Sequence, residues 1–60
     1  MNWIQRGNRH LSAPYHIHSS IKGWEVWLNS KNHYGVLARE LPSLVAAKAY
    51  AEQHAKKEVA

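Results

Sequence analysis

Two histidines of this chain are spaced so that their side chains could act together on one ligand. His16 and His18 stand two residues apart, so in a strand both would project from one face. Imidazole nitrogens bind zinc, and this pair could supply two ligands, with His10 or His33 as the third. On a solvated sheet face such a pair is more often polar surface, which gains positive charge at mildly acidic pH. We therefore expect no metal site.

The chain offers no set of residues for catalysis. Its acids are four glutamates, and it contains neither aspartate nor cysteine. This removes the usual orienting carboxylate of a serine–histidine–aspartate site, and also any thiolate nucleophile or zinc ligand. Glu25 near His16 or His18 would be an isolated base without a nucleophile or an orienting group. We expect a binding protein with no enzymatic activity and no cofactor.

The middle of the chain must position these side chains, and its pattern is typical of three short strands. Residues 15–21 alternate between apolar and polar types, and Lys22-Gly23 then forms a tight-turn signal. Residues 24–28 are rich in strand formers. A polar turn at 29–33 leads to a third strand over 34–41.

Alternation also assigns the second strand's side chains to faces. Trp24, Val26 and Leu28 belong to one face. Glu25 and Trp27 then belong to the other. If Trp24 is in the core, Trp27 must point outward, where a large apolar side chain needs a reason. One reason would be cover by the N-terminal residues 3–4, and the other would be a partner surface.

The third strand allows two registers. In the register that we expect, the inward side chains are Tyr34, Val36 and Ala38, and the outward positions are Gly35, Leu37 and Arg39. The opposite register stays open, because Leu37 and Leu41 are also apolar. A slip of one residue would exchange the two sets.

One alanine-rich helix follows the third strand. Ser43 is a candidate N-cap, and five alanines between residues 46 and 55 give high helix propensity. The sequence thus predicts an α+β fold, a three-stranded antiparallel sheet packed on one C-terminal helix (βββα) with the other sheet face exposed. Residues 1–13 show no clean period and are expected to be an N-terminal arm or loop, whereas residues 14–60 form a single domain.

The charge of the chain favours a polyanionic partner. Its 60 residues carry a net charge of +4 with neutral histidines. The basic side chains of the arm, the turns and the third strand would rim the exposed face and suit phosphate contacts; they are Arg6, Arg9, Lys22, Lys31 and Arg39. No apolar run is long enough to span a bilayer or to act as a signal peptide, so we expect a cytoplasmic protein without membrane contact.

Two runs resemble a known family. Gly23-Trp24-Glu25-Val26-Trp27-Leu28 on the second strand and Ala46-Ala47-Lys48-Ala49-Tyr50 on the helix are similar to the DNA-binding domain of the plant ethylene-response-factor type and its relatives in phage endonucleases and integrase arm-binding domains. The resemblance covers about residues 15–55. It implies that the exposed sheet face enters the major groove of DNA, and its phage branch implies a phage or prophage accessory or regulatory protein.

The resemblance also implies which positions would face DNA. These are His16, His18, Glu25, Trp27, Leu37 and Arg39. The chain departs from the family at Leu37, where an aromatic is usual, and at His16 and His18, where arginines are usual. Arginine is the side chain that reads guanine with a bidentate fork, so these departures weaken direct readout.

Two functions therefore remain open. The first is binding of duplex DNA through the exposed sheet face and the basic turns. The second is a protein–protein interaction module, either a homodimer or an inhibitor of a larger protein, with Trp27, Leu37 and Arg39 as its patch.

Overall fold

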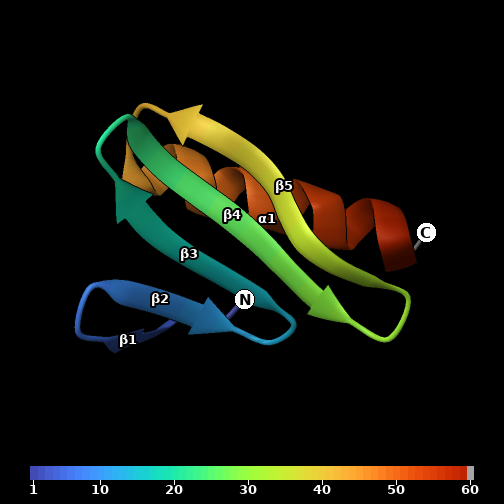
Figure 1. Ribbon diagram of the computed structural model, residues 1–60. Helices are drawn as coiled ribbons and strands as arrows, with labels where there is room; N and C mark the ends of the chain where they lie inside the picture. The colour runs from blue at the N-terminus through green and yellow to red at the C-terminus, as the bar shows by residue number, and fades with distance from the viewer. Residues whose placement is uncertain (60) are drawn as a thin grey trace.

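The computed structural model describes the backbone of residues 1–59 and the side chains of residues 1–57. One antiparallel sheet has its strands in chain order, and a single helix lies across one of its faces (Figure 1). The elements are β1 (Ile4–Arg6), β2 (Arg9–Ser12), β3 (Tyr15–Ser20), β4 (Gly23–Ser30), β5 (His33–Leu41) and α1 (Leu44–Val59). The α+β class and the C-terminal helix are confirmed. In the described residues, no helix is both long and apolar enough to cross a membrane.

The sheet has five strands, so the prediction of three is wrong. The two additional strands come from the segment that we expected to be an arm or loop. A two-residue turn closes them into a hairpin, because Gly7 adopts the left-handed φ of 61° that such turns require. The hairpin then pairs with β3, with Arg9 opposite His18.

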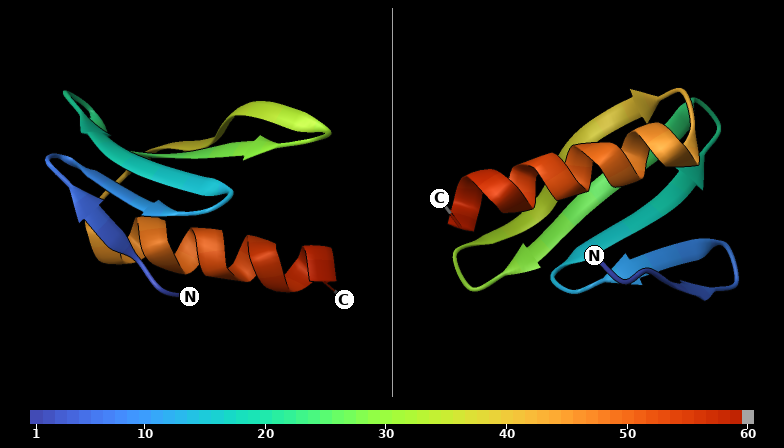
Figure 2. Two further views of the ribbon diagram at one scale, coloured as in Figure 1. Left: turned by 90° about the horizontal axis from the view of Figure 1, so that it is seen from below. Right: turned by 180° about the vertical axis from the view of Figure 1, so that it is seen from behind.

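The N-terminus is held on the helix side of the sheet. The Trp3 indole N–H donates to Glu52 Oε2 at 3.2 Å, and Lys48 Nζ lies 5.9 Å from the Trp3 ring centroid. The chain before β1 runs close to α1 in both views of Figure 2. Trp3 therefore packs on the core, and Ile4 lies on β1, three strands away from Trp27 on β4, so residues 3–4 do not cover Trp27. This excludes the first of the two reasons considered for an outward Trp27.

The core lies between the sheet and α1. β3 and β4 contribute large side chains, and α1 contributes small ones, which let the helix approach the sheet closely. The buried members are Tyr15, Ile17, Val26, Leu28, Ala47 and Ala51. The predicted N-cap is confirmed, because the Ala46 N–H donates to Ser43 Oγ at 3.1 Å. A hydrogen bond of 2.8 Å between Tyr15 Oη and His54 Nδ1 ties β3 to the later part of the helix.

The register between β4 and β5 shifts twice. Trp24 pairs with Leu41, Val26 with Ala38, Trp27 with Val36 and Leu28 with Gly35. Each shift gives β5 one extra residue, as in a β-bulge, and Glu40 there has a φ of 58°.

These shifts change which β5 side chains face the core. Residues directly opposite each other in a sheet share a face, so Val36 lies on the same face as Trp27. Tyr34 is opposite Asn29 and also lies on that face. Leu37 instead packs against the core. The predictions that Tyr34 and Val36 point inward and that Leu37 points outward are therefore wrong, whereas the inward Ala38, opposite Val26, is confirmed.

Gly23 permits the close approach of β4 to the end of β5. Its φ is 145°, and a Cβ atom there would lie 2.8 Å from the carbonyl oxygen of Leu41. We expect Gly23→Ala to lower the free energy of unfolding by about 1–3 kcal/mol, measured by urea denaturation. Gly35→Ala is the matched control, because Gly35 has a similar φ of 156° but meets only the His33 ring at 3.9 Å. Equal losses in the two variants would show that the contact with Leu41 does not matter.

Candidate functional site

The sheet face away from α1 is open, and the strand register arranges its side chains in rows. Directly opposite residues on neighbouring strands share a face, so consecutive pairs define a line across the sheet. One line, the charged row, consists of Arg6, Arg9, His18 and Glu25. The line beside it, the apolar row, consists of Ile4, Leu11, His16, Trp27 and Val36.

Aromatic rings on β3, β4 and β5 meet on the open face. The His18 ring stacks on Trp27 with centroids 5.7 Å apart and planes 28° apart. The Tyr34 ring lies 6.5 Å from Trp27 and is tilted by 60°. The Trp27 indole N–H donates to Glu25 Oε1 at 3.1 Å. The predicted outward orientation of Trp27 is confirmed, and its neighbours fix the ring's position.

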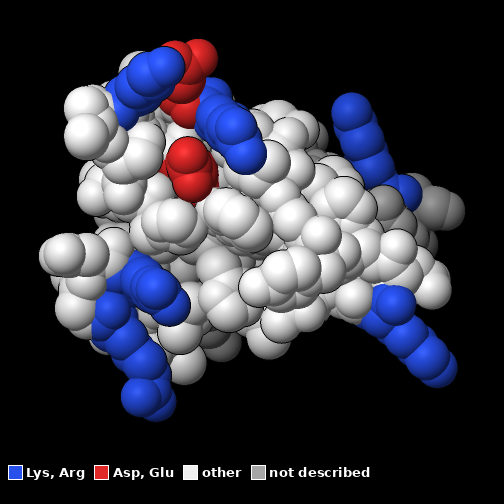
Figure 3. All heavy atoms as spheres, viewed as in Figure 1, with Lys and Arg blue, Asp and Glu red and all other residues white. Residues whose placement is uncertain are grey.

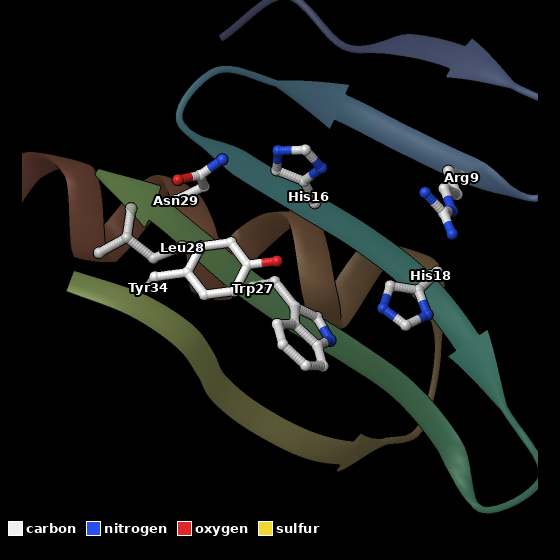
Figure 4. Close-up of a pocket in the computed structure, with 7 residues that line it drawn as sticks. All are labelled: Arg9, His16, His18, Trp27, Leu28, Asn29 and Tyr34. Atoms are coloured by element: carbon white, nitrogen blue, oxygen red, sulfur yellow. The ribbon is translucent and has the colours of Figure 1, made fainter. Parts of the chain in front are cut away.

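A shallow depression lies between these rings and the hairpin strand β2. Its volume is about 340 Å³. Tyr34 and Trp27 border it on the β4–β5 side, and Arg9, His16 and His18 border it on the β2–β3 side (Figure 4). Asn29 and Leu28 complete its lining. The depression therefore offers a ligand both aromatic and basic side chains.

The charged row places two arginines side by side. Arg6 is directly opposite Arg9, and like charges in that relation destabilise a sheet. Among the side chains that the structure describes, neither guanidinium forms a salt bridge. Glu25 lies at the other end of the row, where His18 Nε2 is 3.9 Å from its Oε1. The hairpin end of the row thus carries uncompensated positive charge that an anion would stabilise.

Positive charge surrounds the open face and leaves its centre neutral. Figure 3 shows Lys and Arg side chains over the β1–β2 hairpin and at the turns between β3 and β4 and between β4 and β5, with uncharged atoms between them. Lys22 and Lys31 belong to these turns, and Arg39 is exposed near the end of β5. The acidic side chains visible on this face gather at one corner.

The structure brings together most of the residues that we selected from the sequence. His16, His18, Glu25 and Trp27 share the open face, and Arg6 and Arg9 join them through the hairpin. Leu37 does not, because it packs against the core. The selection missed the outward side chains Ile4, Leu11, Tyr34 and Val36. Alternation alone could not reveal Tyr34, because the bulges reverse the face of this part of β5.

The histidines do not converge on one point. His10 is opposite Ile17 and therefore shares the helix-side face, where it is buried with its ring 6.1 Å from that of Trp24. His16 and His18 lie on the other face. In the part of the chain that the structure describes, no three His, Cys, Asp or Glu side chains come close enough to hold a metal ion.

No protein-family model matches the chain, and no curated protein or solved structure matches it either. The resemblance to the ethylene-response-factor type of domain therefore stays a prediction. The function proposed below therefore rests on the geometry of the open face.

Proposed function

We propose that the protein is a small non-enzymatic module that binds nucleic acid through the open sheet face. The observation that carries the proposal is the pair Arg6 and Arg9, opposite each other and without a salt bridge among the described side chains. This pair continues into a face with the rings of His16, Trp27 and Tyr34, of which Tyr34 is exposed and the other two are half-buried. No described element covers that face.

Nucleic acid offers the two chemistries that this face matches. Its phosphates pair with arginine and lysine, and this contact supplies most of the affinity without reading sequence. Its bases stack on aromatic side chains. The charged row would serve the phosphates, and the rings beside it would serve the bases. The net charge of +4 acts in the same direction over longer range.

A protein partner or a second copy of the chain is the second candidate. It is favoured by the apolar row, in which Ile4, Leu11 and Val36 accompany Trp27. The inward position of Leu37 removes one of the three residues of the patch that we predicted for it. The opposed arginines would also have to be desolvated in an apolar interface, which costs free energy. A mass that rises with concentration in sedimentation, together with indifference to nucleic acid, would favour this candidate.

We expect fluorescently labelled mixed-sequence DNA, as a duplex or as its separated strands, to bind at low salt. The affinity should fall about 10- to 100-fold between about 50 and 200 mM salt, since a few phosphate contacts release counterions. Fluorescence anisotropy measures the affinity. NMR amide shifts should change along the charged and apolar rows and stay constant on α1. Absence of binding by every form at low salt would overturn the proposal.

A further inference from the structure

We infer that the open face binds single-stranded nucleic acid, with bases stacked on Tyr34 and Trp27, in preference to the groove of a duplex. This inference rests on the proposed function and specifies its ligand. Three features of the face lead to it, namely its width, the exposure of Tyr34 and the distribution of its arginines.

The sheet is too wide for the major groove. Neighbouring strands lie about 4.8 Å apart, so five strands span about 19 Å, whereas the groove is about 12 Å wide. A three-stranded sheet of about 10 Å would fit, which is why the two additional strands change the expected ligand. Arg6 on β1 and Tyr34 on β5 lie on the two edge strands, so a duplex groove could not engage both. A single strand laid across the sheet could.

Tyr34 on β5, and the face of Trp27 on β4 that does not stack with His18, are placed to stack with a base. Tyr34 is 76% exposed, and its tilt of 60° to Trp27 keeps the two rings from covering each other. Figure 4 shows both rings on one side of the depression, with His16, His18 and Arg9 on the other. Its volume of about 340 Å³ is at the lower end of the range for small-ligand pockets, which suits one base.

The arginines lie beside the rings, and the apolar row itself contains none. Arg9 borders the depression and Arg6 lies next to it on the far strand β1, so a phosphate at this pair could follow a base held by Tyr34 and Trp27. The apolar row contains no arginine, so the positions beside Trp27 lack the fork that reads guanine. Stacking tolerates every base, so this arrangement fits single strands of varied sequence.

The test compares labelled oligothymidylate and oligouridylate of about 12 nucleotides with a DNA duplex of the same length, by fluorescence anisotropy at low salt. We expect the better single strand to bind at least about tenfold more tightly than the duplex, and the total tryptophan emission to be partly quenched on binding, because Trp27 is one of three tryptophans. The ratio between the thymidylate and the uridylate separates DNA from RNA as the natural ligand.

Tyr34 variants test the stacking itself. Tyr34→Leu should weaken single-strand binding about tenfold, and Tyr34→Phe should restore it, because the ring and not the hydroxyl makes the contact. Tyr50→Leu is the matched control, since Tyr50 is a partly exposed tyrosine on α1. Equal or tighter binding of the duplex, or an unchanged affinity of Tyr34→Leu, would overturn this inference and leave the proposed function standing. Absence of binding by all three probes would overturn both.

Discussion

Replacement of both Arg6 and Arg9 by glutamine is expected to reduce the affinity for nucleic acid about 10- to 100-fold at low salt. Each arginine lost removes one phosphate contact, so the slope of log affinity against log salt should become shallower by about 1.4 for a single strand and about 1.8 for a duplex. The fold should survive, because the exchange relieves repulsion between two residues that are directly opposite each other. Anisotropy titrations at several salt concentrations measure both quantities, and circular dichroism checks the fold.

The matched control replaces Lys56 and Lys57 with glutamine. These side chains are exposed in the last turn of α1, which lies on the other face of the sheet, so the variant loses the same charge away from the hairpin (Figure 2). If net charge alone governed binding, the two double variants would lose similar affinity. A loss confined to the Arg6 and Arg9 variant would assign the phosphate contact to the hairpin. Similar losses would remove the charged row from the site.

The sequence predicted β3, β4 and α1 because one physical rule dominates each of them. In β3 and β4, one face is buried and the other is open, so apolar and polar residues alternate, and this places Ile17 and Val26 in the core and Trp27 outside. In α1, Ser43 marks the start and alanines mark the contact with the sheet. Burial here follows directly from the spacing of residue types.

β5 could not be predicted in the same way, because its apolar residues do not alternate. Val36, Leu37 and Ala38 are consecutive, and the bulges allow Leu37 and Ala38 to serve the core while Val36 stays outside. A bulge depends on how two strands fit together, and a single strand's pattern does not contain that information. The wrong register for β5 matters for function, because it placed Tyr34 in the core and Leu37 on the open face.

The hairpin of β1 and β2 was missed for a different reason. β1 is three residues long and exposed along its whole length, so no buried face leaves a period in the sequence. Its pairing depends on a turn at Gly7 and on the neighbouring edge of β3. Arg6 and Arg9 were selected from the sequence as basic residues of a loose arm, whereas the hairpin fixes them in line with His18. The site is therefore more ordered than composition could indicate.

The order of the open face depends on the thin core beneath it, and the stability of the Ile17→Ala variant should measure this dependence. Ile17 is 0% exposed between α1 and the sheet. Its neighbours in the chain, His16 and His18, belong to the apolar row and the charged row respectively. Removal of its outer carbons should lower the free energy of unfolding by about 2–4 kcal/mol. A protein of this size has a total of about 3–9 kcal/mol, so much of the variant should be unfolded at 37 °C.

Ile21→Ala is the control for that loss, because Ile21 lies just beyond β3 and is fully exposed. Its unfolding free energy should stay within about 0.5 kcal/mol of the parent protein. Thermal and urea unfolding followed by circular dichroism compare the three proteins. If Ile17→Ala were as stable as Ile21→Ala, the sheet would not depend on burial against α1. The rows on the open face would then need another source of rigidity, since the described core contains only one other side chain larger than alanine that is as fully buried, Val26.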